Sequence, residues 1–315
     1  MDKCVAHLTK TVVEPTRLLR VGGLIAAAFL VFCVPAYAQN TSGDAGSSAG
    51  ELLRRVVNSE LKAQANDPSH WMYEVKAGVS GKEQVKVAVQ TREGYLDRLR
   101  FVNGQPITPE REKQEDQQIA RLLKNPAERK KQQRAQEQDA QKTERLFKML
   151  PDAVTAHYGK RQGELVEILF KPNPHFHPPS HEAAVFHAMA GGISINTREN
   201  RLVEIEGHLT SGVKFGGGLL GHLDKGGEFH VKQSEVTPGL WEITLLHVNM
   251  RGKALFFKTI AVQENEVRTN FQRVPDNLTL SEAIQHLQRQ STAKSASVPG
   301  GTTAPEVDRS RSSSN

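Results

Sequence analysis

Apolar and polar residues alternate along much of this chain, a pattern typical of strands with one buried face. In the first half it predicts strands at Trp71–Ala77, 85–89 and Tyr95–Val102. In the second half it predicts seven more, at Leu165–Lys171, Gly192–Thr197, Leu202–Leu209, Glu228–Val236, Leu240–Met250, Lys253–Val262 and Glu266–Val274. Turn sequences separate several of these strands, among them Arg251-Gly252 and Glu264-Asn265. Ten strands in up-and-down order predict a curved antiparallel half-barrel, mainly β with some α.

Helical periodicity occurs at the two ends of this strand-rich region. Residues Glu51–Gln64 place leucines and valines on one face, and Asn66-Asp67-Pro68 follows as a stop. Near the other end, Asn277–Gln288 has the same kind of apolar face. We expect these helices to cover the concave side of the half-barrel.

A very polar stretch interrupts the strands and predicts a helical insertion over residues 109–150. It contains good helix formers, and Asn125-Pro126 divides it into two helices. Its apolar side chains gather near its ends, where we expect them to dock the insertion over the mouth of the half-barrel: Ile119, Leu122, Leu123, Leu146 and Phe147. The middle lacks the apolar seam of a sustained coiled coil, so a solvated arm is favoured over a dimerising coiled coil.

The N-terminal residues have the layout of a secretory signal peptide. Basic residues precede the uncharged segment Val21–Val34, and small residues stand before a cleavage point between Ala38 and Gln39. We therefore expect residues 1–38 to direct export to the periplasm or cell envelope. A flexible leader would follow at 39–50, then a single domain at 51–290 and a disordered tail at 291–315.

Composition narrows the class of protein further. The chain has 315 residues, 37% of them hydrophobic, and a net charge of +6 that is spread along its length. This distribution argues against a nucleic-acid partner. The one long apolar run, Val21–Val34, belongs to the predicted signal peptide, so we expect no transmembrane span in the mature chain, and we expect a monomer. Both cysteines, Cys4 and Cys33, precede the cleavage point, so the mature chain would have no disulfide and no thiolate metal site.

The order of these elements resembles the exported LolA/LolB-like family of bacterial lipoprotein carriers. The likeness is concentrated in Arg201–Pro275, in strings such as Arg201-Leu202-Val203-Glu204-Ile205-Glu206-Gly207, Gly239-Leu240-Trp241 and Gly252-Lys253-Ala254-Leu255-Phe256-Phe257-Lys258, and it is closest to uncharacterised exported bacterial proteins. The resemblance implies an amphipathic first helix, an unclosed half-barrel and helices that plug its mouth. It also implies a lipid or lipoprotein partner, although the long polar insertion departs from the carriers.

A histidine cluster is the sharpest candidate for metal chemistry. His175, His177 and His181 flank a Pro-rich segment, and Glu182 follows them. Three imidazoles with a carboxylate could hold zinc or copper. The spacing does not match a known zinc motif, so a rigid loop with solvated histidines is the favoured interpretation.

Two other patterns are weaker indications of a functional site. Gly216-Gly217-Gly218-Leu219-Leu220-Gly221 matches G-x-G-x-x-G, but a strand rather than a helix is predicted after it, so we expect a rim loop and no nucleotide cofactor. Four carboxylates are expected mostly on the solvent side of their strands: Glu204, Glu206, Glu235 and Glu242.

These observations favour a non-enzymatic envelope protein that binds or carries an apolar ligand, such as a lipid or lipidated segment, in its half-barrel. The predicted cavity lining is Val85, Val87, Leu99, Phe101, Val203, Ile205, Trp241, Ile243 and Phe257. A packed core made of the same residues is the alternative at the level of structure. Alternative functions are a metal-binding exported protein or enzyme built on the histidines, and an envelope scaffold that uses the helical arm.

Overall fold

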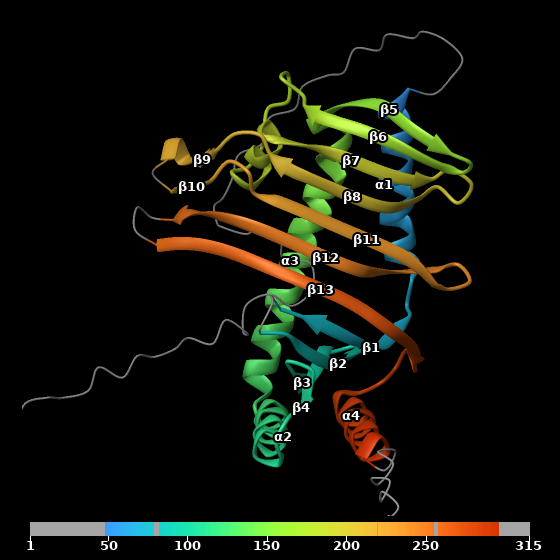
Figure 1. Cartoon of the computed structure of the whole chain (residues 1–315), viewed down its shortest axis with the longest axis vertical. Helices are drawn as coiled ribbons and strands as arrows, with labels where there is room; N and C mark the ends of the chain where they lie inside the picture. Colours follow the sequence, from blue (N-terminus) through green and yellow to red (C-terminus); the bar gives the residue numbers. More distant parts are fainter. Residues whose placement is uncertain (1–47, 79–81, 219, 255–257, 296–315) are drawn as a thin grey trace, which may run out of the picture.

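The computed structural model describes residues 48–78, 82–218, 220–254 and 258–295. Within them, one antiparallel sheet of thirteen strands runs in the order β4-β3-β2-β1-β13-β12-β11-β8-β7-β6-β5, and the β9–β10 hairpin joins it at β12 (Figure 1). Its strands are β1 (His70–Ala77), β2 (Gln84–Thr91), β3 (Gly94–Val102), β4 (Gln105–Pro106), β5 (Val154–Gln162), β6 (Leu165–Pro172), β7 (Met189–Asn196), β8 (Arg201–Leu209), β9 (Val213–Phe215), β10 (Gly221–Leu223), β11 (Glu228–Thr237), β12 (Leu240–Ala254) and β13 (Lys258–Val274). The sheet is open and curved, and helices cover it, as the predicted fold class requires.

The last part of the sheet differs from the sequence prediction. The two predicted strands Lys253–Val262 and Glu266–Val274 are replaced by one strand, β13, of 17 residues. It pairs with β12 from Ala254↔Lys258 to Leu245↔Val267, so the predicted turns at Arg251-Gly252 and Glu264-Asn265 are wrong. Those polar residues lie inside a continuous ladder, where cross-strand hydrogen bonds outweigh their preference for turns. Strands β4, β5, β9 and β10 were not predicted.

Helix α1 (Ala49–Asn66) starts two residues earlier than predicted because Ser48 caps it. The Ser48 hydroxyl accepts from the Glu51 N–H at 3.2 Å, and the Glu51 carboxylate accepts from the Ser48 N–H at 2.8 Å. This reciprocal capping box satisfies two backbone donors at the helix start. The face of α1 that carries Leu53 and Val56 is completely buried.

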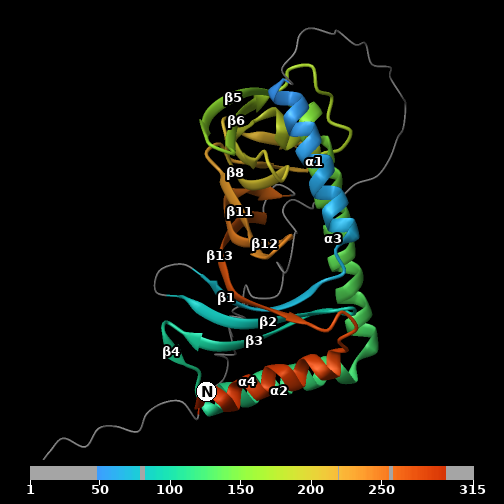
Figure 2. The same ribbon diagram turned by 90° about the vertical axis from the view of Figure 1, so that its right-hand side faces the viewer.

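The polar insertion is two helices, as predicted: α2 (Pro109–Lys124) and α3 (Pro126–Ala153). Asn125 ends the first and caps the second, with its side-chain oxygen accepting from the Glu128 N–H at 3.1 Å. Both ends of the insertion pack on the body, because Ile119 is buried at one end and Leu150 at the other. The insertion therefore lies along the molecule instead of projecting from it (Figure 2).

The closing helix α4 (Leu280–Ser295) is shifted relative to the prediction of 277–288. Thr279 stands before it, and its hydroxyl accepts from the Glu282 N–H at 3.3 Å, so the start is set by a side-chain cap. Residues 291–295, expected in the disordered tail, continue this helix. The predicted signal peptide, its cleavage point at Ala38 and Gln39, and most of the predicted leader lie outside the described residues.

The strand register defines two faces of the sheet. The inner face is the one on which Leu246 packs into the core under α1, and the opposite face is the outer face. Leu246 pairs with Glu266, and two residues further along β13 Arg268 pairs with Val75, so the inner face continues onto β1. Alternation then places Met72 on the outer face, where it packs with α2 and α4. The expectation that all helices cover the concave side is therefore corrected: α1 and the end of α3 cover the inner face, whereas α2 and α4 cover the outer face of β1–β3 (Figure 2). Ile119, Leu122 and Leu123 accordingly dock on the outer face and not over the mouth of the half-barrel.

Gly216–Gly218 form a short 3₁₀ turn, η3, in the β9–β10 hairpin, in agreement with the predicted rim loop. Gly216, Gly217 and Gly218 all have positive φ, from 56° to 97°, a conformation that glycine adopts at little cost. A strand follows the turn, so no helix N-terminus is offered to a pyrophosphate. In the described part of the chain, no helix combines the length and the apolar character that crossing a membrane requires.

Candidate functional site

A cavity of about 360 Å³ lies at the end of the inner face, between α1 and the β5–β6 hairpin. The residues that line it are Leu52, Arg55, Tyr158, Gly159, Arg161, Val166, Thr197 and Asn200. They come from α1, β5, β6 and the turn between β7 and β8. The cavity is therefore formed where the first helix covers the sheet edge incompletely.

The register explains how these side chains meet. Val166 on β6 pairs with Arg161 on β5, and the fully buried Ile168 pairs with Tyr158, so both β5 side chains share the inner face. Tyr158 nevertheless remains 51% exposed, since β5 is the last strand in the sheet order and pairs on one side only. The half-exposed Tyr158 ring therefore lies where the cavity opens to solvent.

The cavity combines apolar and cationic groups. Leu52 and Val166 provide apolar surface, and both are at least 95% buried. Arg55 and Arg161 place two guanidinium groups at the same cavity, and the Arg161 Nε donates to the Gly163 carbonyl at 3.3 Å. Guanidinium groups suit carboxylate or phosphate partners, since they can donate two parallel hydrogen bonds.

None of the predicted lining residues belongs to this cavity. Val87 and Leu99 are buried on β2 and β3, with Val87 in the outer-face core under α4. Val85 pairs with Phe101 between those strands, and both are half-buried. The remaining described residues, Val203, Ile205, Trp241 and Ile243, lie on β8 and β12 and are half-buried, while Phe257 is outside the described residues. Ile205 and Ile243 pack against the main core and Val87 belongs to the outer-face core, so the packed-core alternative describes these three.

The middle of the inner face carries charge that the sequence analysis did not place there. Glu264 and Glu266 follow Val262 at alternate positions of β13 and pair with the buried Val248 and Leu246. Arg268 comes next; its Nη2 lies 2.9 Å from a Glu266 carboxylate oxygen, and its guanidinium lies 5.8 Å from the Tyr73 ring centre. Because the sequence prediction assigned a turn to Glu264-Asn265, it broke the alternation that would have revealed this row.

Burial raises the pKa of two carboxyl groups, those of Glu264 and Glu242. Desolvation, together with the neighbouring Glu266 carboxylate, raises the pKa of Glu264 to about 7 against a smaller lowering effect of Arg268. Desolvation, followed by repulsion from Asp67, likewise raises the pKa of Glu242 to about 7. The expectation of a solvent-facing position is thus wrong for Glu242, which is largely buried, whereas Glu206 and Glu235 are exposed as predicted.

The histidine cluster does not assemble into a metal site in the structure. His175 and His177 are exposed in the loop after β6, and His181 precedes a short 3₁₀ helix, η2 (Glu182–His187). Within the described ranges, the group of three metal-ligating side chains with atoms near enough to share an ion is a different one, Glu204, Glu206 and His230. Hydrogen bonds within the segment hold the loop, among them one of 2.9 Å between the His187 Nε2 atom and the Phe176 carbonyl oxygen.

The chain matches no family model, no curated protein and no solved structure. The fold and the cavity therefore define a class only in structural terms, as an open antiparallel half-barrel with helices on both faces.

Proposed function

We propose that this chain is an exported envelope protein that binds an amphiphilic ligand in the cavity between α1 and the β5–β6 hairpin. The observation that carries the proposal is the cavity itself, at about 360 Å³ and on the inner face of the sheet. That volume is within the range of about 300–1,000 Å³ that small-molecule sites occupy. The proposed role is binding or carriage, with no chemical step on the ligand.

The lining supports an apolar chain with an anionic head as the ligand. Leu52, Val166 and the Tyr158 ring would contact the chain, whereas Arg55 and Arg161 would contact a carboxylate or phosphate. The resemblance of the element order to LolA/LolB-like carriers supports the same class of ligand, a lipid or lipid-modified segment. The signal-peptide pattern supports a location in the periplasm or envelope.

The direct test is extraction of lipid from the purified full-length protein, followed by mass spectrometry and by titration with a fluorescent fatty acid. We expect stoichiometric binding that weakens about tenfold or more in the double variant Arg55→Gln/Arg161→Gln, since two charged hydrogen-bond donors are lost. The matched control is Arg54→Gln/Lys160→Gln, which removes the same charge from neighbouring positions that do not line the cavity.

Two outcomes would contradict the proposal. One is a protein that carries no lipid and ignores the fluorescent probe. The other is equal weakening in both double variants, because this would show attraction by general positive charge and not by the cavity.

A further inference from the structure

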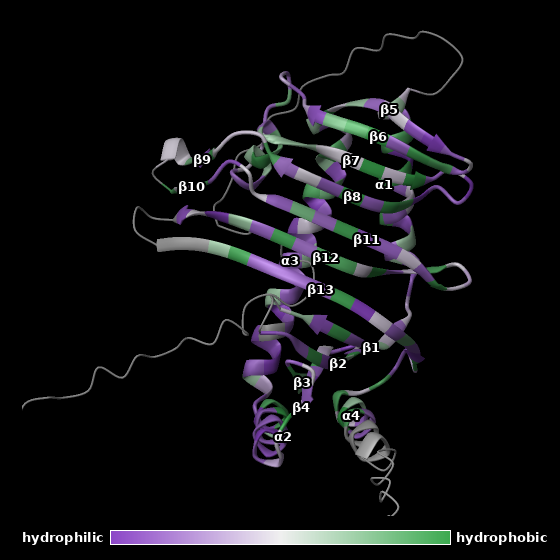
Figure 3. Ribbon diagram, viewed as in Figure 1, coloured by the Kyte–Doolittle hydropathy of each residue, from purple (hydrophilic) through white to green (hydrophobic). Residues whose placement is uncertain are grey.

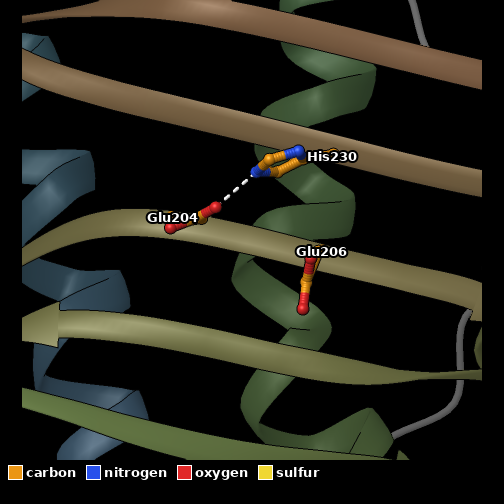
Figure 4. A group of neighbouring side chains, drawn as sticks. All are labelled: Glu204, Glu206 and His230. Atoms are coloured by element: carbon orange, nitrogen blue, oxygen red, sulfur yellow. Dashed lines mark hydrogen bonds and ion pairs between the residues drawn. The ribbon is translucent and has the colours of Figure 1, made fainter.

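The outer face of the sheet carries a group of ligating side chains on two neighbouring strands. Glu204 and Glu206 lie on β8, and His230 lies on β11 directly opposite Glu206. The His230 Nε2 atom is 2.5 Å from Glu204 Oε1, and one ligand atom from each of the three residues lies within 4.8 Å of the other two. In Figure 4 the two carboxylates rise from the same strand, and the imidazole approaches from the next one.

Alternation explains why these three side chains share a face. Ile205, between the two glutamates, packs into the core on the inner face, which directs Glu204 and Glu206 outward. Figure 3 shows the same alternation of apolar and polar residues along β8, β11 and β12. The site is accessible from solvent, since the side chains of Glu204 and His230 are 30% and 32% exposed.

The surrounding residues continue the pattern. His208 on β8 is opposite Glu228 on β11, and His230 is opposite His247 on β12. The His247 Nε2 lies 3.5 Å from a Glu228 carboxylate oxygen. Imidazoles and carboxylates are therefore grouped on the outer face of three strands, and Lys232, opposite Glu204, adds one positive charge beside them.

From this geometry we infer that Glu204, Glu206 and His230 form a binding site for a divalent transition metal ion, and that Zn²⁺ fits its chemistry. An imidazole nitrogen and two carboxylate oxygens are ligands that Zn²⁺ accepts, at about 2.0–2.2 Å each. The ion would take the place of the contact between the His230 imidazole and the Glu204 carboxylate, and it would relieve the repulsion between two carboxylates on one strand. Three protein ligands leave a fourth position open on the solvent side, where a water molecule or a partner's side chain can bind.

The inference is independent of the proposed ligand cavity, which lies on the inner face and uses none of these residues. It also differs from the loop histidines, which the sequence pattern singled out. A strand pair fixes its side chains better than a loop does, because cross-strand hydrogen bonds set the register.

The test is calorimetric titration of ZnCl₂ into the full-length protein prepared without an affinity tag, together with visible absorption of the Co²⁺-substituted protein. We expect one Zn²⁺ per chain, with affinity lowered about tenfold or more in His230→Ala and in Glu206→Gln. The β signal in circular dichroism serves as the folding control for each variant, and Glu204→Gln provides a third substitution if one of these fails to fold. His175→Ala, in the loop, should leave the affinity unchanged.

Absence of Zn²⁺ binding above that of a buffer blank would overturn the inference. Binding that survives in folded His230→Ala and Glu206→Gln, or that is lost in His175→Ala, would overturn it equally, because the ion would then be held elsewhere.

Discussion

Glu60 on α1 and Arg201 on β8 form a bidentate ion pair that links the first helix to the centre of the sheet. The Arg201 Nε lies 2.9 Å from Glu60 Oε1, and its Nη2 lies 3.1 Å from Oε2. Glu60 Oε1 also accepts from the Leu202 N–H at 2.7 Å and from the Gln233 side chain at 3.0 Å. The Arg201 guanidinium in turn lies over the Trp241 ring, with its Cζ atom 5.3 Å from the ring centre. One carboxylate thus connects α1 with β8 and β11, and its partner extends the contact to β12.

Removing this carboxylate should destabilise the protein strongly. The side chains of Glu60 and Arg201 are only 12% and 14% exposed, so Glu60→Ala would leave a guanidinium and two donors poorly solvated. We expect the free energy of unfolding to fall by about 3–5 kcal/mol. Urea denaturation followed by circular dichroism measures this change.

The control for that prediction is Arg54→Ala, which breaks the ion pair with Asp152 at 2.6 Å. Both side chains of that pair are more than half exposed, so we expect a loss of about 1 kcal/mol or less. Similar losses in both variants would show that burial does not distinguish the two pairs.

Gly191→Ala should also be strongly destabilising. A Cβ at Gly191 on β7 would lie 1.9 Å from the Glu206 backbone carbonyl oxygen, and a backbone atom within a ladder cannot move aside. We expect a loss of about 2 kcal/mol or more in the free energy of unfolding, or failure to fold. The neighbouring Gly192→Ala meets nothing nearer than 3.7 Å, so its unfolding midpoint in the same denaturation experiment should stay close to that of the parent protein. A tolerated Gly191→Ala would contradict the close approach of β7 and β8.

The sequence predicted the parts of this fold in which local pattern and tertiary structure agree. The break at Asn125 is an example, because a proline and a capping side chain act locally and no distant contact opposes them. The strands around Ile193 and Val248 were equally predictable, since each alternates cleanly between core and solvent.

Where pairing between strands far apart in the sequence decides the structure, the local sequence pattern predicted the wrong element or none. Glu264-Asn265 has the composition of a turn, yet pairing with Val248 and His247 on β12 holds it as strand. On its other side the Gly78 N–H donates to the Asn265 carbonyl at 3.1 Å. Strand β5 has little apolar pattern and depends on pairing with β6. Glu204 and His230 of the outer-face group are 26 residues apart in the chain, and only the register of β8 with β11 brings them together.

Buried carboxylates should make stability depend on pH near neutrality. The pKa of Glu242 is raised to about 7 in the folded protein, above its ordinary value of 4.5. The folded state therefore holds this proton more tightly than the unfolded state does, so the contribution is fully present below about pH 4.5 and is lost as the pH rises through 7. Glu242→Gln should be more stable than the parent protein by about 1–3 kcal/mol at pH 8, and the difference should vanish near pH 4.

Denaturation in urea at several pH values between 4 and 8 measures this dependence. Glu282→Gln is the control with the opposite sign, because the Thr279 backbone N–H and hydroxyl lower the pKa of Glu282. That variant should lose stability at pH 8 instead of gaining it. A Glu242→Gln variant whose stability follows the parent at every pH would show that the buried carboxylate keeps its ordinary pKa.

The polar insertion should stabilise the protein through its apolar ends and not through its middle. Ile119 on α2 is 9% exposed and packs with α4 over Val87, Val89 and Leu96 on the outer face. Ile119→Ala removes three carbon atoms from this contact, and we expect a loss of about 2–3 kcal/mol together with stronger binding of the dye ANS. Gln138 is at an exposed position in the middle of α3. Gln138→Ala should change the free energy of unfolding by no more than about 0.5 kcal/mol, and it should leave ANS binding nearly unchanged. Because α2 and α4 lie on the outer face, Ile119→Ala should leave the fatty-acid affinity of the inner cavity unchanged. A large loss for Gln138→Ala, or none for Ile119→Ala, would mean that the insertion is held by the polar contacts of α3, such as that of Arg129 with Glu93 at 3.3 Å.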